Sequence, residues 1–284
     1  MQLERIPIRS TIIAPKDHYL INFDLAQAES WIVAYLANEP TMKHVLAHGD
    51  LHRETAQHAF AEVDDATWDL FPKVEQKARR YTGKRYNHAS AYRMTPSRAA
   101  EVINKDSDKP PYVVVTVAES KVFSQKWHGH YHITGWWAEI EQELGRTRTL
   151  TTPYGRTRYF FQHWGNELFK EATAYVPQST VADHMDGCVH DELGIEGGVL
   201  QVHKRLVVPG HIKIVNQSHD SILCEVPKSS ALDISQQIVT LLLRPLVVNG
   251  EEFTIPVDCE VGERWGELKE QKREVGTYDI KYDF

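Results

Sequence analysis

Cysteine is scarce in this sequence, and its placement argues against several classes of protein. Three cysteines occur in 284 residues, at positions 188, 224 and 259, and no two of them form a closely spaced pair. That spacing argues against a disulfide framework or a cysteine-based zinc site and predicts a reducing compartment. No apolar run is long enough to span a bilayer and no signal-peptide pattern opens the chain, so we expect a cytoplasmic protein with no membrane partner.

An overall excess of basic residues is also missing. The formal net charge is −7, from 32 Lys and Arg against 39 Asp and Glu. A chain with this charge binds nucleic acid well only if its basic residues are concentrated. They are concentrated in residues 73–98, which hold eight basic residues and one acid, Glu75.

Within that basic segment, four residues recur every fourth position and share one face of a predicted helix: Arg80, Lys84, His88 and Tyr92. The face offers cations for a triphosphate and rings for a sugar and base. The alternative is a solvated basic face, but the acids that would form i,i+4 pairs along such a face are lacking.

The stretch Tyr19–Leu36 predicts a buried strand that ends at Asp24 and is followed by a helix. On this stretch alone, the commoner interpretation of Asp24 is a helix cap. A second stretch, His211–Pro227, changes that balance, because its alternating apolar residues predict a β-hairpin with Asp220 at the turn. Two carboxylates that converge need cations between them, as in two-metal phosphoryl-transfer sites.

Three of these stretches resemble the motifs of the family A DNA polymerases, the DNA polymerase I type. DLAQAES at 24–30 resembles the first palm motif DYSQIEL, RRYTGKRYNHASAY at 79–92 resembles the fingers-helix motif, and SHDSILCEVP at 218–227 resembles VHDELVFEVP. Four further blocks agree in order and spacing: IPIR at 6–9, GDLHRETA at 49–56, TPYGRTRYF at 152–160 and PQSTVAD at 177–183. The resemblance runs from about Leu3 to Trp265.

The resemblance implies roles for particular residues. Asp24, the carbonyl of Leu25 and Asp220 would hold two Mg²⁺ ions, and Arg80 and Lys84 would take part in catalysis by gripping the β- and γ-phosphates. The implied nucleotide-binding residues are Gln27, Glu29 (the steric gate that favours deoxynucleotides), His52, Arg80, Lys84, His88 and Tyr92. The implied DNA-binding residues are Arg9, Lys170, Gln178 and His219.

Some positions depart from the family pattern. His88 stands where most relatives have Phe or Tyr, Ala89 replaces a glycine, and Ser221 replaces a glutamate. We expect His88 to weaken discrimination against nucleotides that lack the 3′-hydroxyl. The histidines of WHGHYH at 127–132 could share a face, but without a nearby carboxylate or cysteine a structural or DNA-facing role is favoured over a metal site.

The resemblance implies an α+β fold, with a palm built on an antiparallel sheet (residues 1–50 and 166–284) and helical fingers (residues 51–165). We expect no thumb in the chain. The chain is expected to be either a palm-and-fingers piece of a polymerase or one half of a split polymerase. A phage-like split gene, in which a separate chain supplies the thumb or an exonuclease, would explain the second option.

The predicted function is template-directed DNA polymerisation on primer-template DNA with dNTPs. Two alternatives stay open: a catalytically idle DNA-binding subunit of a split polymerase, and a single-subunit RNA polymerase. Glu29 argues against the second, and the retained Asp24, Asp220, Arg80 and Lys84 argue against the first.

Overall fold

The computed structural model describes residues 8–187, 196–273 and 279–283, which divide into two compact units. Unit 1 consists of Met1–Ala28, Pro153–Arg156 and Ser179–Phe284, and unit 2 consists of Glu29–Thr152 and Thr157–Gln178. The assignment of residues 1–50 and 166–284 to a palm and of 51–165 to fingers stays a prediction.

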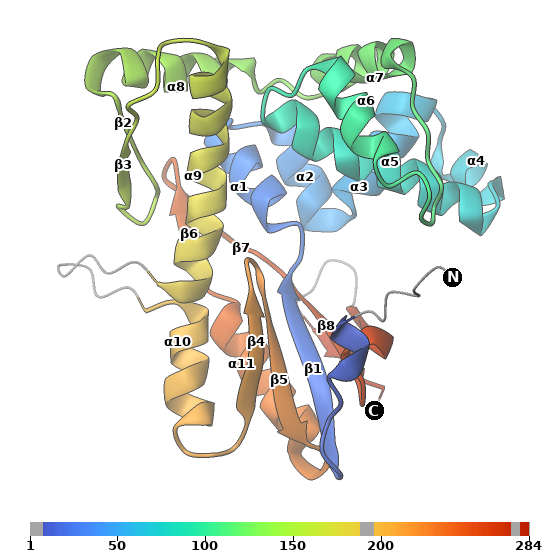
Figure 1. Ribbon diagram of the computed structural model, residues 1–284, viewed down its shortest axis with the longest axis vertical. Helices are drawn as coiled ribbons and strands as arrows, with labels where there is room; N and C mark the ends of the chain where they lie inside the picture. Colours follow the sequence, from blue (N-terminus) through green and yellow to red (C-terminus); the bar gives the residue numbers. More distant parts are fainter. Residues whose placement is uncertain (1–7, 188–195, 274–278, 284) are drawn as a thin grey trace, which may run out of the picture. The chain divides into compact units, whose positions relative to one another are not determined.

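Unit 1 is built on a six-stranded antiparallel sheet with the strand order β10-β9-β8-β1-β5-β4. Four of these strands, β8, β1, β5 and β4, are labelled in Figure 1. Its strands are β1 (His18–Leu25), β4 (Lys213–Ser218), β5 (Ser221–Pro227), β8 (Val257–Gly262), β9 (Lys269–Arg273) and β10 (Ile280–Lys281). β4 and β5 form the predicted hairpin, with His219 and Asp220 in its two-residue turn. The central strand β1 lies between β5 and β8.

The two faces of this sheet differ in chemistry because side chains alternate along each strand. On one face, Ile21 and Phe23 of β1 pair with apolar residues of both neighbouring strands, and all of these side chains are buried: Cys224, Ile222, Val261 and Cys259. The opposite face of β1 carries the buried Leu20 and then the half-buried polar residues Asn22 and Asp24. Toward its Asp24 end, the strand therefore has one core face and one polar face.

Unit 1 also contains helices, which supply apolar cover for the sheet. Helix α11 (Ala231–Leu242) contacts β5 and buries a stripe that includes Ile234, Ile238 and Leu242 (Figure 1). The remaining elements of this unit are η1 (Ile8–Thr11), α10 (Gly198–Val202), η3 (His203–Val207), η4 (Lys228–Ser230), η5 (Trp265–Glu267) and a second hairpin of β6 (Pro245–Val248) and β7 (Glu251–Thr254).

Unit 2 is mainly helical. Its helices are α1 (Ala28–Leu36, whose first residue belongs to unit 1), α2 (Pro40–His48), α3 (Leu51–Glu54), η2 (Thr55–Ala61), α4 (Asp65–Leu70), α5 (Lys73–Ala91), α6 (Pro96–Asn104), α7 (Val117–His130) and α8 (Thr134–Thr147). A short hairpin of β2 (Thr149–Thr151) and β3 (Thr157–Tyr159) follows. Helix α9 (Asn166–Asp186) belongs to unit 2 up to Gln178 and to unit 1 beyond it.

Local sequence accounts for several of these helix ends. Asp50 and Asp64 cap α3 and α4 by accepting backbone N–H groups, and Thr116 forms a reciprocal capping box with Glu119 at α7. The sequence predicts a helix over residues 167–185 with a break or kink at Pro177; in the structure one helix, α9, continues through Pro177. Among the described residues, none of the helices combines the length and hydrophobicity that a bilayer span requires.

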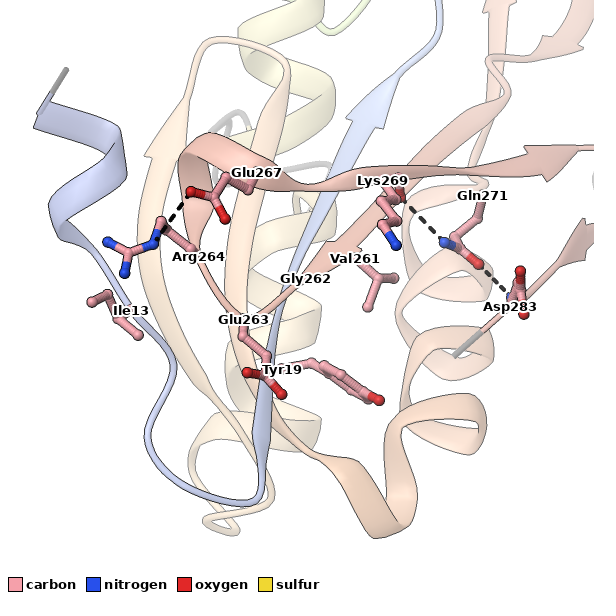
Figure 2. Close-up of a pocket in the computed structure, with 10 residues that line it drawn as sticks. All are labelled: Ile13, Tyr19, Val261, Gly262, Glu263, Arg264, Glu267, Lys269, Gln271 and Asp283. Carbon is pink, nitrogen blue, oxygen red and sulfur yellow. Dashed lines mark hydrogen bonds and ion pairs between the residues drawn. The ribbon is translucent and has the colours of Figure 1, made fainter.

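The predicted α+β class is confirmed, but two local predictions are wrong. The run of acids in residues 63–72 predicts a linker, yet this segment contains α4, whose Trp68 is 2% exposed. The polar composition of the last twenty residues predicts a tail, yet β9, which carries Lys269 and Gln271 (Figure 2), and β10 extend the sheet. Backbone pairing places these polar strands at the sheet edge, where few apolar residues are needed.

Candidate active site

Asp24 and Asp220 are brought together by backbone pairing within unit 1. Asp24 lies near the end of β1, opposite Ser221, the first residue of β5. The next residue along, Leu25, donates its backbone N–H to the carbonyl of Asp220 at 2.9 Å. The hairpin turn is therefore tied to the end of β1. The residue immediately before α1 is Gln27, so Asp24 is a strand residue and not the N-cap.

The face that carries Asp24 is rich in acids. Asp258 on β8 lies directly opposite Asp24 on its other side, and Glu260 lies opposite Asn22. Burial raises the pKa of Glu260, and the neighbouring carboxylates of Glu270 and Asp258 raise it further. Sequence reasoning missed Asp258 and Glu260, although both belong to β8, in which buried and half-buried residues alternate. Their alignment with Asp24 depends on strand register, which the sequence does not reveal.

The donor set around Asp24 and Asp220 suits a hard divalent cation. Magnesium in nucleotide-processing sites is held by one or two carboxylates together with substrate phosphates. Within the part of the chain that the structure describes, no three His, Cys, Asp or Glu side chains converge as a complete protein-only metal site. A pair of carboxylates that needs further oxygen ligands from a substrate fits this arrangement.

In unit 2, the predicted helix face is present on α5 and is joined by His52 from α3. Arg80, Lys84 and His88 follow one another along α5, and the rings of His52 and His88 lie 6.1 Å apart. Tyr92 follows the last residue of the helix as its C-cap. We refer to His52, Arg80, Lys84 and His88 as the basic cluster.

Close contact between α3 and α5 requires glycine at position 83. A Cβ built on Gly83 would lie 2.3 Å from the backbone oxygen of His52, which no side chain tolerates.

Burial lowers the pKa of His52 to about 3. The Asp50 carboxylate opposes this shift, and the positive charges of Arg80, His88 and Lys84 offset part of its influence. His52 is therefore a neutral imidazole beside a cationic helix face.

Asp50 anchors the basic cluster and was not identified from sequence. Its carboxylate accepts the backbone N–H of His52 at 2.9 Å and pairs with Arg80 at 2.5 Å. Burial opposes ionisation of Asp50, but the charge and hydrogen bond of Arg80 more than offset it, so its pKa lies below the ordinary value. The acids that the basic segment lacks locally are thus supplied in part by the fold, since Arg85 also pairs with Asp106 at 2.8 Å.

Glu29 is held against the same helix. The Tyr92 hydroxyl donates a hydrogen bond to Glu29 Oε2, and His88 Nδ1 lies 3.8 Å from the same oxygen. Burial and the adjacent carboxylate raise the pKa of Tyr92 well above its usual value, so this hydroxyl stays protonated. Three residues with predicted nucleotide contacts therefore converge within unit 2.

The other predicted residues lie as follows. In unit 1, Arg9 stacks on the Trp265 ring with 5.0 Å between guanidinium and centroid, and His219 is exposed at the hairpin turn. Gln27 adopts a φ of 54°, and its side-chain oxygen is buried without a hydrogen-bond partner in the described structure. In unit 2, Lys170 pairs with Glu167 at 2.8 Å, and Gln178 is exposed on α9.

Comparison with known proteins places this geometry in a family. The family model described as DNA polymerase family A matches residues 2–267. The chain belongs to DNA polymerase family A. As a family A chain, it is 23% identical over 282 residues to DNA polymerase I of Helicobacter pylori, with 94% of this chain and 28% of that protein covered. It is 26% identical over 273 residues to the thermostable DNA polymerase I of Thermus filiformis, with 93% and 29% covered.

A solved structure supports the family A fold independently. The POL domain of Pol1 from M. smegmatis, in complex with DNA primer-template and dNTP, matches with a TM-score of 0.68 and 18% identity. The match covers 91% of this chain and 42% of that one. The chain thus spans less than a third of the length of the two curated relatives described above.

The histidines at 127–132 differ from expectation in this family A chain. They lie mainly at the end of α7, and a carboxylate is nearby, contrary to the prediction: Glu54 Oε1 lies 3.6 Å from His130 Nε2 and Glu54 Oε2 lies 3.4 Å from His58 Nε2. Trp127 is fully buried, and its indole donates to Asn87. Trp127 and Tyr131 therefore belong to the core of unit 2, while the histidines are half-buried or exposed and their structural or DNA-facing role stays a prediction.

Proposed function

We propose that this chain is the catalytic portion of a DNA polymerase, which adds deoxynucleotides to a primer 3′-hydroxyl under the direction of a template. The observation that carries the proposal is the adjacency of Asp24 and Asp220, fixed by the backbone hydrogen bond from Leu25 to Asp220. Family membership and the basic cluster support it.

The carboxylates and the backbone carbonyl have one role in this proposal. Two Mg²⁺ ions held by Asp24, Asp220 and the Leu25 carbonyl would, when bound, activate the 3′-hydroxyl and neutralise phosphate charge. The neighbouring acids on the same sheet face add negative potential, which favours cation binding.

The basic cluster has the complementary role. In the reaction, the bond from the primer O3′ to the α-phosphorus forms as the bond to the bridging oxygen breaks, and pyrophosphate leaves. Arg80 and Lys84 would bind the β- and γ-phosphates and stabilise the charge that develops there, and Lys84 could donate a proton to the leaving group. Glu29 and Tyr92 would line the sugar site and leave no space for a 2′-hydroxyl.

The remaining predicted residues would bind substrate without taking part in bond changes. Gln27, His52 and His88 are assigned to the incoming nucleotide, and four residues are assigned to the primer-template: Arg9, Lys170, Gln178 and His219. Arg9 and His219 lie in unit 1, while Lys170 and Gln178 lie on α9.

Single-nucleotide extension of a primed template in Mg²⁺ tests this proposal. The chain should extend the primer with dNTPs, and both Asp24→Asn and Asp220→Asn should abolish extension while leaving the far-UV circular dichroism unchanged. Glu252→Gln, which removes an exposed charge on β7, is the matched control and should retain activity.

Other outcomes would favour the alternatives. Primer-template binding without extension would favour an idle DNA-binding subunit, and restoration of extension by an added thumb-containing polypeptide would favour a split polymerase. Incorporation of ribonucleotides in preference to deoxynucleotides would favour an RNA polymerase. Extension that survives both aspartate substitutions would contradict the metal assignment.

A further inference from the structure

Asn87 is the centre of a buried polar network in unit 2 that ends on His52. It lies on α5 and is 3% exposed. Its side-chain oxygen accepts the indole N–H of Trp127 at 2.8 Å and is 2.9 Å from the Thr55 hydroxyl. Its side-chain nitrogen lies 3.0 Å from His52 Nδ1 and 3.3 Å from the carbonyl of Leu51.

The orientation of the Asn87 amide follows from the chemistry of its neighbours. An indole N–H can only donate a hydrogen bond, so the Asn87 atom that faces Trp127 must be the oxygen. A backbone carbonyl can only accept, so the atom that faces Leu51 must be the nitrogen. Trp127 and Leu51 thus independently determine the same orientation of the Asn87 amide, with its NH₂ group toward His52.

This orientation determines which nitrogen of His52 carries the proton. The Asn87 NH₂ donates to His52 Nδ1, so Nδ1 must present its lone pair. A neutral imidazole then carries its hydrogen on Nε2. Among the described residues, none hydrogen-bonds to that nitrogen, so its N–H is available to a ligand.

The charge state is also determined by the surroundings of His52. Its side chain is buried beside the Asp50 carboxylate, the Arg80 and Lys84 cations and the His88 ring; burial first, and then the cations, lower its pKa to about 3 against the opposing charge of Asp50. A third full positive charge is therefore disfavoured at this place. A neutral N–H donor can approach a phosphate oxygen there without repelling its cationic neighbours, whereas the opposite tautomer would point a lone pair at the phosphate.

We propose that Asn87 is a positioning residue that locks His52 as the neutral Nε2–H tautomer, so that His52 donates a hydrogen bond to the phosphates of the incoming nucleotide. The inference rests on the proposed function for the identity of the ligand. The tautomer itself is a property of the protein alone and can be measured without any substrate.

Asn87→Asp is the decisive variant, because it preserves shape and still accepts from Trp127. The new carboxylate would face Nδ1, so Nδ1 must carry a proton and the neutral ring loses its Nε2–H. Imidazole ¹⁵N spectra of the substrate-free chain at neutral pH should show the Nε2–H tautomer for His52, assigned with His52→Gln. The spectra of Asn87→Asp should show a proton on Nδ1.

Kinetics of the same variant supply the functional test. Because the carboxylate raises the pKa of His52, Asn87→Asp should lose roughly 10- to 100-fold in kcat/KM for dNTP at alkaline pH. Activity should recover as the pH falls, since the doubly protonated ring regains its Nε2–H. The unaltered chain should show no such recovery. His52→Gln retains an N–H donor, so adding Asn87→Asp to it should cause no further pH-dependent loss.

Thr55→Val and Tyr131→Phe are the matched controls, since both alter the same buried network without touching His52. Each should lower the melting temperature and leave the His52 spectrum and pH profile unchanged. An Nδ1–H spectrum in the unaltered chain would overturn the inference. The inference would also be overturned if the His52 spectrum showed the Nε2–H tautomer but neither His52→Ala nor Asn87→Asp changed the dNTP kinetics. If the chain shows no polymerase activity, the proposed function fails, while the spectra still decide the tautomer.

Discussion

The Tyr92 hydroxyl donates a hydrogen bond to the Glu29 carboxylate across 63 residues of sequence. Glu29 lies in the first turn of α1, and Tyr92 is the C-cap of α5. The hydrogen bond fixes the direction of a carboxylate that is 20% exposed, so that its position does not depend on rotamer freedom. A fixed carboxylate is a better steric and electrostatic barrier than a mobile one.

Glu29→Ala is expected to relax sugar selection. Removal of the carboxylate opens space where a 2′-hydroxyl would lie, so the ratio of ribonucleotide to deoxynucleotide incorporation should rise by roughly 10- to 100-fold. Tyr92→Phe, which keeps the ring but frees Glu29, should cause a smaller rise. Single-nucleotide kcat/KM values with matched dNTP and rNTP measure both effects. Unchanged selectivity in Glu29→Ala would remove Glu29 from the sugar site.

His88 is expected to weaken discrimination against 2′,3′-dideoxynucleotides. Its imidazole can form a hydrogen bond near the 3′ position, where a phenyl ring cannot, and so make up for the missing 3′-hydroxyl. The rates of dNTP and ddNTP incorporation should therefore differ by less than about tenfold. His88→Phe should raise the preference for the deoxy form. Competition between dNTP and ddNTP in primer extension is the measurement. A preference of many hundredfold in the unaltered chain would contradict this prediction.

Acid should destabilise the fold through two buried histidines. The pKa of His52 is lowered to about 3 and that of His184 to about 4, in both cases mainly by burial and then by nearby charges. Because the folded-state values lie below the ordinary value, the unfolded chain binds more protons, so this stability is present above about pH 6.5 and lost as the pH falls. Between about pH 7 and pH 5 each histidine should account for about 2 kcal/mol.

Denaturant unfolding across that pH range checks the assignment. His52→Gln and His184→Gln should each flatten the dependence of the unfolding free energy on pH. His163→Gln alters an exposed histidine and should leave the slope unchanged. An equally steep slope in the buried-histidine variants would show that other groups cause the acid sensitivity.

Gly83→Ala should separate α3 from α5. The added Cβ would meet backbone atoms, among them the His52 oxygen at 2.3 Å, and backbone cannot move aside as a flexible side chain can. We expect a loss of roughly 2 kcal/mol or more in unfolding free energy and a weaker dNTP affinity. Gly129→Ala, at an α7 position with open space around the Cβ, is the matched control and should be neutral or stabilising.

Comparable stability of Gly83→Ala and the unaltered chain would mean that α3 and α5 are not in close contact in solution. Retained stability with weaker dNTP affinity would instead indicate that the two helices adjust to the added methyl group and displace His52.

Much of the fold followed from the sequence, because its signals are local. The strand at 18–25, the hairpin that turns at Asp220 and the long helix from Asn166 all follow from periodicity and turn chemistry. The edge strands β9 and β10 did not, since polar strands at a sheet edge lack the apolar alternation on which prediction relies.

Sequence analysis identified the residues of the candidate site more completely than the residues that hold them in position. Resemblance pointed to His52 and Arg80, whereas Asp50 and Asn87 lie in the same two blocks, 49–56 and 79–92, and were assigned no role. Their roles depend on contacts 30 and 35 residues distant, which are determined by helix packing and not by spacing. The same holds for Asp258, whose place beside Asp24 depends on the register of β8.

The two-faced sheet of unit 1 has a consequence for how this chain can change over time. Apolar positions such as Ile21 and Phe23 are fully buried in the core, whereas the alternate positions Asn22 and Asp24 are only half-buried and lie on the polar face. Substitutions in alternate positions of one strand therefore fall under separate constraints. A lineage could lose or retune the chemistry of the acidic face while its melting temperature stays the same, so an inactive relative would remain a well-folded protein.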